Sequence, residues 1–250
     1  MSNKFKLEEN KHSNIKKVIA VVSGKGGVGK STVTSLLALQ AQRLGYKAAI
    51  LDADIIGPSI PKIFGLKEMA TANNVGIKPS VTSSGIKVMS TQLMLENETD
   101  PVIWRSPLVL STVKQFYTDV LWEDVDYLFV DMPPGTGDIQ LTLFQSIPVD
   151  GIVVVTSPQE LVSVIVQKSI NMAKMMKKDI IGVVENMAYF IAPDTKKRYD
   201  VFGTSHTKNI LDNHDLKLLG EVPIDSELLK AADSGTIEEY ECNYLKDFFK

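Results

Sequence analysis

The chain has almost no cysteine, and this scarcity excludes a fold stabilised by disulfides. Cys242 is the only cysteine among 250 residues, so no intrachain disulfide can form. Such a composition fits a reducing compartment, and we expect a cytoplasmic protein. The amino-terminal residues lack an apolar signal core, and no apolar run approaches the roughly 20 residues that a membrane span requires. We therefore expect no membrane anchor.

Positive charge is not in excess either. Lysine and arginine together number 27 against 30 aspartates and glutamates, so the formal net charge is −3. Proteins that bind nucleic acid neutralise its phosphates with basic side chains, so this balance argues against a nucleic-acid partner. Hydrophobic residues make up 44% of the chain, which is enough to form a full core.

Apolar segments of strand length alternate with segments of helix length along the chain. Helices are predicted at residues 33–44, 106–120 and 158–177, and strands at residues 17–22, 47–54, 86–93, 127–132, 151–156, 179–184 and 216–222. This alternation predicts an α/β fold, a doubly wound and mostly parallel sheet with helices on both faces. We expect residues 17–250 to form a single domain and the polar residues 1–16 to be a disordered tail.

The most specific motif is a glycine-rich loop between the first predicted strand and the first predicted helix. It fits the phosphate-loop pattern G-x-x-x-x-G-K-[ST], in which successive backbone N–H groups point at one anion. Lys30 supplies a positive charge for the β- and γ-phosphates, and the Ser31 hydroxyl is placed to ligate Mg²⁺. A chance glycine-rich turn is the alternative, which the strand–loop–helix context disfavours. The predicted nucleotide-binding residues of the loop are Gly24, Lys25, Gly26, Gly27, Val28, Gly29, Lys30, Ser31 and Thr32.

Two apolar strands end in aspartate near this loop. Asp52 and Asp54 alternate at the end of one strand, so their side chains lie on the same side of the chain. Asp131 ends another strand. A hard cation such as Mg²⁺ prefers carboxylate oxygens, and the carboxyl ends of parallel strands meet at one edge of a sheet. Aspartate is common in turns, so each residue alone is a weak signal, but together with the loop they predict a magnesium site.

The lysine after the first glycine of the loop indicates which class of phosphate-loop protein this chain resembles. Lys25 is not required by the general pattern, and it resembles the deviant loop KGGxGK[ST] of the ATPases that include MinD, ParA, the nitrogenase iron protein and the Mrp family. In that group this lysine reaches across a dimer to the partner's nucleotide. The resemblance therefore implies a homodimer in which Lys25 is catalytic, and a solvated loop lysine is the alternative.

Other motifs resemble the Mrp/ApbC family of iron–sulfur cluster carrier ATPases. DADIIGPSIP at residues 52–61 resembles DxDIxGPSxP, and DYLFVDMPPGTGD at residues 126–138 is similar to DYLxxDxPPGTGD. Three shorter motifs also match, which are WRSP at 104–107, VENM at 184–187 and LGEVPID at 219–225. In the first of them serine stands where the family usually has glycine. The resemblance therefore runs from about residue 16 to the end. It implies the P-loop NTPase fold and slow, Mg²⁺-dependent ATP hydrolysis that serves as a conformational switch.

The resemblance also assigns roles to individual residues. It implies that Asp54 orients the attacking water, so the catalytic residues are Lys25, Lys30 and Asp54. The residues implied around Mg²⁺ are Ser31, Asp52 and Asp131. An adenine pocket is implied at Asn186, Pro223 and Asp225, because a side-chain amide and an open backbone turn suit the hydrogen-bonding edge of adenine. Residues 52–61 are implied as one switch segment and residues 135–138 as a second.

The sequence departs from this family at the cluster motif. After Phe190, Mrp-type carriers usually have Cys-Pro-x-Cys, through which two subunits share a bridging iron–sulfur cluster. Here Ala192 and Thr195 stand in the cysteine positions. Neither side chain offers the thiolate that such clusters require, so we expect no cluster held through this motif. A role in metallocentre assembly would then depend on assembly proteins or apo-client proteins as partners.

Two other functions fit the loop. The first is a positioning or regulatory ATPase like MinD or ParA, but a MinD-like anchor needs a basic amphipathic helix, and residues 238–250 carry four acidic residues and two lysines. The second is a phosphate-transferring or ligase-type enzyme of the same superfamily, for which no second-substrate motif is present. The motifs GPSIP at residues 57–61 and PPGTGD at residues 133–138 favour the Mrp-type ATPase over both alternatives.

Overall fold

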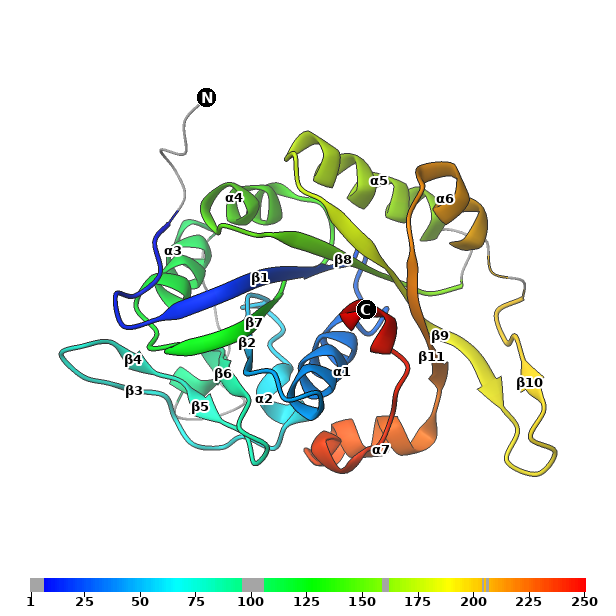
Figure 1. Ribbon diagram of the computed structural model, residues 1–250, viewed down its shortest axis with the longest axis horizontal. Coiled ribbons are helices and arrows are strands. Elements are labelled where there is room, and N and C mark those ends of the chain that lie inside the picture. The colour runs from blue at the N-terminus through cyan, green and yellow to red at the C-terminus, as the bar shows by residue number, and fades with distance from the viewer. Residues whose placement is uncertain (1–6, 96–105, 159–161, 204, 206) are drawn as a thin grey trace.

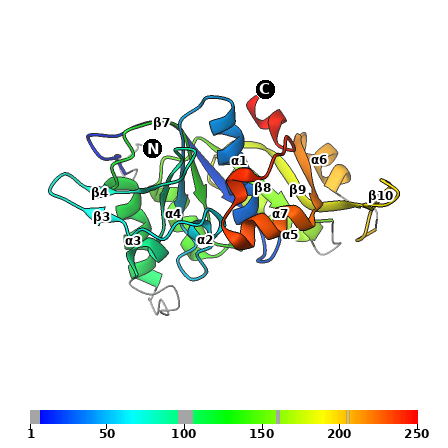
Figure 2. The same ribbon diagram turned by 90° about the horizontal axis from the view of Figure 1, so that it is seen from below.

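A mixed sheet runs through the centre of the computed structural model, with helices on both faces (Figures 1 and 2). The structure describes residues 7–95, 106–158, 162–203, 205 and 207–250. Within these residues the sheet has nine strands in the order β10-β9-β8-β1-β7-β2-β6-β5, with β11 paired to β9. They are β1 (Asn14–Val22), β2 (Ala48–Asp52), β5 (Ser80–Val81), β6 (Lys87–Met89), β7 (Asp124–Asp131), β8 (Gly151–Thr156), β9 (Ile180–Ile191), β10 (Arg198–Tyr199) and β11 (Leu218–Ile224).

The central strands pair in parallel, which confirms the predicted fold class. β1 pairs in parallel with β7 and β8, β7 with β2, and β9 with both β8 and β11. The two short strands β5 and β10 are antiparallel to their neighbours. A separate two-stranded ribbon joins β3 (Thr71–Ala72) to β4 (Ile77–Lys78).

The helices form two layers. One face of the sheet packs against α3 (Ser106–Thr118), α4 (Asp138–Ser146), α5 (Val162–Met175) and α6 (Thr207–His214). The other face packs against α1 (Lys30–Arg43), α2 (Ile60–Ile63), α7 (Ser226–Ser234) and the carboxyl-terminal segment, which contains the 3-10 turns η2 (Ile237–Glu239) and η3 (Lys246–Phe249). A third 3-10 turn, η1, covers Thr91–Met94. In β1, Val18 and Ala20 face the first layer while Ile19 and Val21 face the second, as the two-residue period of a strand requires.

Several element boundaries differ from the predictions, and the contacts explain three of the differences. β6 ends at Met89 instead of continuing to residue 93, because the Ser90 side chain accepts a hydrogen bond from Gln92 N and starts η1. β9 continues to Ile191, well past the predicted end, because β11 and β10 extend its pairing. β1 begins at Asn14, which pairs with Asp124, so residues 14–16 of the predicted tail form strand. Residues 1–6 lie outside the described residues, and the single-domain assignment stays a prediction.

No helix in the described residues is both long and apolar enough to cross a membrane.

Candidate functional site

The glycine-rich loop connects β1 to α1 at the carboxyl edge of the sheet. Gly27 and Gly29 have φ angles of +81° and +77°, a backbone conformation that suits glycine. A Cβ atom on Gly29 would lie 2.1 Å from Asn186 Nδ2, whereas one on Gly26 or Gly27 would meet open space. The loop is therefore fixed on one side by Asn186 and open on the other, and α1 points its amino terminus at that opening.

Lys30 and Asp131 form a buried ion pair at the base of the loop. Lys30 Nζ lies 2.6 Å from Asp131 Oδ2, and the two side chains are 6% and 0% exposed. Ser31 Oγ donates to Oδ2 at 2.6 Å, and Thr34 Oγ1 donates to Oδ1 at 2.7 Å. Among the described residues, Lys30 Nζ has no well-aligned hydrogen-bond acceptor, so its N–H groups can serve a bound anion.

Asp52 lies beside Asp131, because the two residues are paired in register at the ends of β2 and β7. Burial and then the negative charge of Asp131 raise the pKa of the Asp52 carboxyl to about 8. Ser90 Oγ donates to Asp52 Oδ2 at 3.1 Å, and Asp54 N donates to Oδ1 at 3.2 Å. The carboxyl groups of Asp52 and Asp131 and the Ser31 hydroxyl thus lie at the same edge of the sheet. These hard oxygen donors fit Mg²⁺, whose charge would offset the excess of carboxylate over ammonium.

A cleft of about 350 Å³ opens over the loop. Asp54 lines it and is half-buried, with Gly57 N donating to its Oδ1 at 3.3 Å. Burial raises the pKa of the Asp54 carboxyl above its usual range. The cleft is also lined by residues near α2, by the residue after Pro133 and by residues of α7, which are Ser59, Lys62, Pro134, Leu229, Ala232 and Asp233. A polyphosphate held by the loop would therefore lie against Asp54.

A second pocket of about 260 Å³ adjoins this cleft. It is lined by Asn186 from β9 and by Pro223, Ile224 and Asp225 at the end of β11. Gly27, Gly29 and Thr32 of the loop also line it, so the predicted adenine residues and the predicted phosphate residues share one site. Asn186 Nδ2 donates to Val28 O at 2.9 Å, which joins the two parts directly.

The sequence reasoning missed several residues of this site. Thr34 has no place in the loop pattern, although its position four residues after Lys30 on a helix was a usable signal, because such residues share a helix face. Leu228, Leu229 and Ala232 of α7 also line the second pocket. No motif marks them, and Leu229 is 63% exposed although it is hydrophobic. Gly24 and Lys25 lie at the start of the loop and are partly exposed.

Comparison with known proteins agrees with this geometry. Residues 14–248 match the model of a ParA family described as NUBPL iron-transfer P-loop NTPase. The chain belongs to this family. It is thus a member of the Mrp/ApbC group within the MinD/ParA superfamily, as the motifs predicted.

Two proteins named iron–sulfur cluster carrier protein are close in sequence. The one from Clostridium perfringens is 46% identical over 237 residues, covering 92% of this chain and 83% of that protein. The one from Methanocaldococcus jannaschii is 47% identical over 232 residues, covering 92% of this chain and 80% of that protein.

Solved structures share the fold. A nucleotide-binding protein from Archaeoglobus fulgidus, solved in complex with ADP, is 44% identical with a TM-score of 0.83, covering 94% of this chain and 91% of that chain. The cell-division ATPase MinD of Pyrococcus furiosus is 18% identical with a TM-score of 0.65, covering 93% and 95% of the two chains, and it shows the fold alone.

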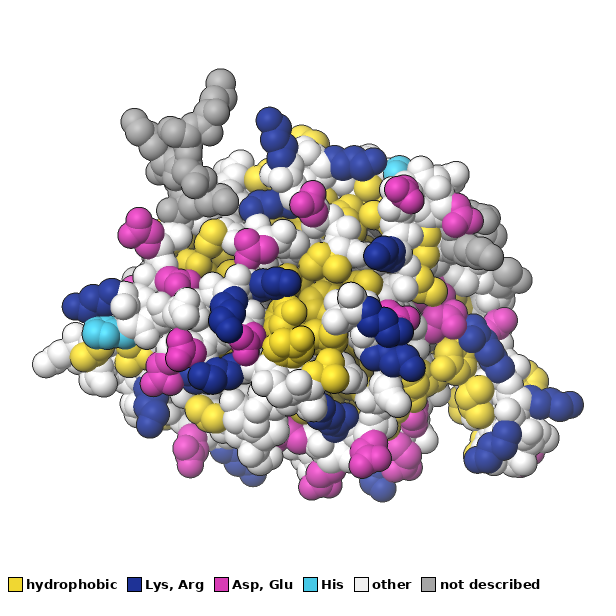
Figure 3. Space-filling view, viewed as in Figure 1, with side chains coloured by type: hydrophobic (Ala, Val, Ile, Leu, Met, Phe, Trp, Pro, Cys, Tyr) yellow, Lys and Arg dark blue, Asp and Glu magenta, His cyan; other side chains and the backbone are white. Residues whose placement is uncertain are grey.

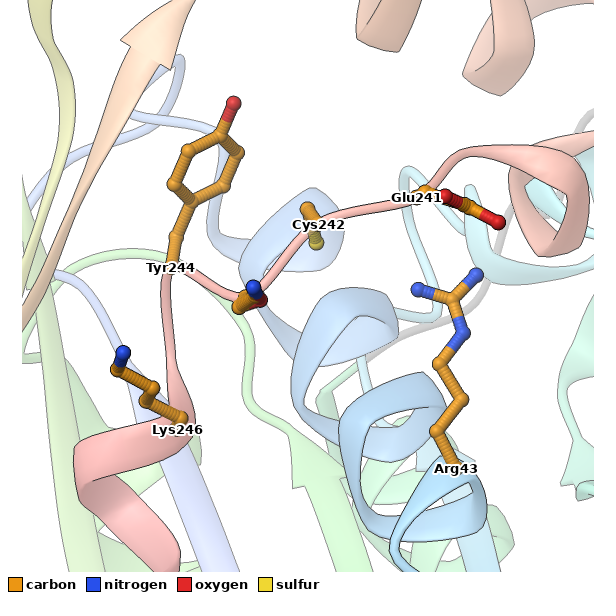
Figure 4. Close-up of a pocket in the computed structure, with 6 residues that line it drawn as sticks. Arg43, Glu241, Cys242, Tyr244 and Lys246 are labelled. Carbon is orange, nitrogen blue, oxygen red and sulfur yellow. The ribbon is translucent and has the colours of Figure 1, made fainter.

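The two positions where the resemblance leads us to expect cysteine lie on an arm that projects from the sheet, which Figure 1 shows as the end of β9 with β10. Ala192 and Thr195 are in the tip, where Lys196 N donates to Ala192 O at 2.9 Å to close the turn. No group of three or more histidine, cysteine or acidic side chains among the described residues could hold a metal ion. Cys242 is on the carboxyl-terminal segment, next to α1 (Figure 4).

The arm is braced on one face and exposed on the other. Arg198 makes paired hydrogen bonds of 3.0 and 3.2 Å to Glu221 on β11, and its guanidinium lies 4.1 Å from the centre of the Tyr189 ring. On the opposite face Phe190 is paired with Tyr199, and both side chains are exposed. Figure 3 shows hydrophobic and basic side chains together on this arm.

Proposed function

We propose that the protein is a Mg²⁺-dependent ATP hydrolase that uses ATP binding and hydrolysis as a conformational switch in iron–sulfur or related metallocentre assembly. The observation that carries this proposal is that the phosphate cleft and the second pocket adjoin and share residues of the loop. A phosphate loop with a buried Lys30–Asp131 pair opens directly into a pocket lined by Asn186 and Asp225. The relatives named iron–sulfur cluster carrier proteins and the relative solved with ADP support the same function.

In this proposal the loop binds the triphosphate. Backbone N–H groups of the open loop and the amino terminus of α1 bind phosphate oxygens, and Lys30 reaches the β- and γ-phosphates. Asp131 holds the Lys30 ammonium in place through the 2.6 Å contact. Magnesium would be held by Ser31, Asp52 and Asp131, and when bound it would neutralise charge on the β- and γ-phosphate oxygens.

Asp54 is the residue proposed to orient the attacking water. It lines the phosphate cleft, and its carboxylate is steadied by Gly57 N. A carboxylate at this place accepts a hydrogen bond from water and directs the water oxygen to the γ-phosphorus. The new P–O bond forms as the bond to the β-phosphate oxygen breaks, and ADP, phosphate and a proton leave.

Lys25 is proposed to act in a homodimer. Its position at the partly exposed start of the loop fits a lysine that reaches a second subunit. A positive charge supplied across a two-fold axis would stabilise the charge that develops on the transferred phosphoryl group. Because Ala192 and Thr195 supply no thiolate, the metallocentre itself would be held by an assembly partner or an apo-client protein and not by this arm.

A nucleotide panel tests the proposed function. Binding of ATP, GTP and inorganic tripolyphosphate to the purified protein is measured with Mg²⁺, followed by release of phosphate from ATP. We expect ATP to bind more tightly than both other ligands and to be hydrolysed slowly, near the low end of enzyme rates. Tripolyphosphate binding equal to ATP binding would contradict the adenine assignment. Bound but unhydrolysed ATP would contradict the hydrolase assignment.

A further inference from the structure

The carboxyl-terminal segment is fixed against the rest of the molecule behind the second pocket. After α7 it passes through η2 and over α1, as the red ribbon in Figures 1 and 2 shows. Arg43 Nη2 donates to Glu238 O at 3.0 Å and to Tyr240 O at 2.7 Å. The Glu238 carboxylate accepts from Thr82 Oγ1 at 2.6 Å and from Ser84 N at 2.9 Å. Residues 238–240 are therefore held from two sides, by Arg43 and by residues 82–84.

Tyr240 uses this fixed position to bind Asp225. Its hydroxyl donates to Asp225 Oδ2 at 2.6 Å, while Asp225 Oδ1 accepts from Glu227 N at 2.8 Å and caps α7. Each oxygen of the Asp225 carboxylate thus accepts one hydrogen bond, and the two hydrogen bonds together set the orientation of the carboxylate. The Tyr244 hydroxyl lies 3.2 Å from the Tyr240 hydroxyl and comes from the part of the segment drawn in Figure 4.

The hydroxyl of Tyr240 stays a donor at ordinary pH. Partial burial, and then the hydrogen bond to Asp225, raise the pKa of Tyr240 above its usual value. Asp225 lines the same pocket as Asn186 and Pro223. A carboxylate has about four lone-pair sites, so two contacts leave it able to accept from a ligand.

We propose that Tyr240 is a positioning residue of the nucleobase pocket, and that the carboxyl-terminal segment sets the preference for adenine by fixing the Asp225 carboxylate. Adenine carries an amino group at position 6, which a fixed carboxylate can accept from. Guanine bound in the same orientation presents a carbonyl oxygen at that position, which the carboxylate repels. This inference rests on the proposed nucleotide function, because it assigns the base to the pocket of Asn186 and Asp225.

The test uses Tyr240→Phe, which removes the hydroxyl alone, in the full-length protein with Mg²⁺. Dissociation constants are measured for ATP, GTP and inorganic tripolyphosphate. We expect ATP affinity to fall about tenfold, because the Asp225 carboxylate loses one of the two contacts that fix its orientation toward the base, and the ATP-to-GTP preference to fall with it. Tripolyphosphate affinity should stay within about twofold, because the phosphate loop is not touched.

A double-mutant cycle shows whether Tyr240 acts through Asp225. Asp225→Asn should itself weaken ATP binding without weakening tripolyphosphate binding. Adding Tyr240→Phe to Asp225→Asn should then cause less than about a twofold further loss, because the shared interaction is already weakened. The matched control is Tyr199→Phe, which removes an exposed hydroxyl on β10 and should leave all three affinities unchanged.

Three results would overturn the inference. The first is that Tyr240→Phe leaves ATP affinity and the ATP-to-GTP preference unchanged. The second is that Tyr240→Phe lowers the affinities for ATP and for tripolyphosphate equally. The third is that the effects of Tyr240→Phe and Asp225→Asn on ATP affinity are fully additive. If Tyr240→Phe does not fold, the three dissociation constants are measured on Asp225→Asn instead. The inference is then overturned if Asp225→Asn does not lower ATP affinity more than tripolyphosphate affinity. Failure of the proposed function is distinguishable, because the unmodified protein would then bind tripolyphosphate as tightly as ATP.

Discussion

The nucleotide edge and the projecting arm are joined by β9, which carries Asn186 at the edge and continues to Ile191 in the arm. The two regions differ in how their charges are held. At the edge, the Lys30–Asp131 pair has side-chain exposures of 6% and 0%. On the arm, the Arg198–Glu221 pair has exposures of 46% and 32%. Removing one member of a buried pair leaves an uncompensated charge, whereas water replaces a lost partner at the surface.

This difference shows where the sequence can change without loss of the fold. At the edge, Lys30, Ser31 and Thr34 all converge on Asp131, so each is constrained by the others. At the arm, Ala192 and Thr195 are in an exposed turn whose closing hydrogen bonds use backbone atoms. Cysteine can therefore be absent from the arm without disturbing the strand that carries Asn186.

The largest expected effect comes from removing the buried cation. Lys30→Ala should weaken ATP binding by at least about 100-fold, because the main phosphate charge is lost. It should also lower the free energy of unfolding by about 3 kcal/mol, because Asp131 stays buried without its ammonium. Calorimetric titration and denaturant unfolding measure the two effects, with Lys196→Ala on the arm as control. ATP affinity within threefold of the unmodified protein would exclude the assigned role.

Asp54→Ala separates binding from turnover at the same edge. We expect ATP affinity to change by less than about threefold and the hydrolysis rate to fall by about 100-fold, since the carboxylate acts on the water and not on the phosphates. Single-turnover phosphate release measures the rate. Glu227→Ala changes an exposed side chain of α7 that lines neither pocket, and it serves as the acidic control. A normal rate in Asp54→Ala would show that another group orients the water.

Mixing two inactive variants tests whether Lys25 acts across a dimer. A heterodimer of Lys25→Ala and Asp54→Ala subunits has one site that lacks both side chains and one that carries both, if Lys25 acts in trans. Recovery to about half of the unmodified rate per dimer is then expected. The dimer is confirmed by differential tagging. A confirmed heterodimer without recovery would place Lys25 in its own subunit's site.

We expect the unmodified arm to hold no iron–sulfur cluster, and the arm with two introduced cysteines to hold one. Anaerobic reconstitution with iron and sulfide should give no stoichiometric cluster, because Ala192 and Thr195 offer no thiolate. The double substitution Ala192→Cys and Thr195→Cys should give a cluster shared by two subunits, measured by iron and sulfide content and by absorbance. Cys242→Ser is the control. A stable cluster on the unmodified protein that survives Cys242→Ser would contradict the prediction.

The smallest effect is expected at the arm's ion pair. Arg198→Ala should lower the free energy of unfolding by no more than about 1 kcal/mol, because both partners are partly exposed and water screens them. ATP affinity should not change. Denaturant unfolding beside Lys30→Ala gives the direct comparison. A loss as large as that of Lys30→Ala would show that the brace by Arg198 stabilises the whole sheet.

The sequence by itself determined the fold class and predicted the chemistry of the nucleotide edge. The loop from Gly24 to Thr32 has a fixed spacing, and the buried strands before Asp52 and Asp131 are continuous apolar runs, so short-range patterns were sufficient. The resemblance also singled out Asn186, Pro223 and Asp225, which the structure brings to one pocket. Their roles stay predictions.

Only the tertiary structure decided which distant residues meet at these motifs. Thr34 bonds Asp131 across 97 residues of sequence, α7 closes both pockets with no motif of its own, and β9 runs on into the arm. The Tyr240–Asp225 bond likewise depends on Arg43, nearly 200 residues earlier, holding the segment. Such contacts follow from how helices and strands pack, and a pattern read along one chain carries no record of that packing.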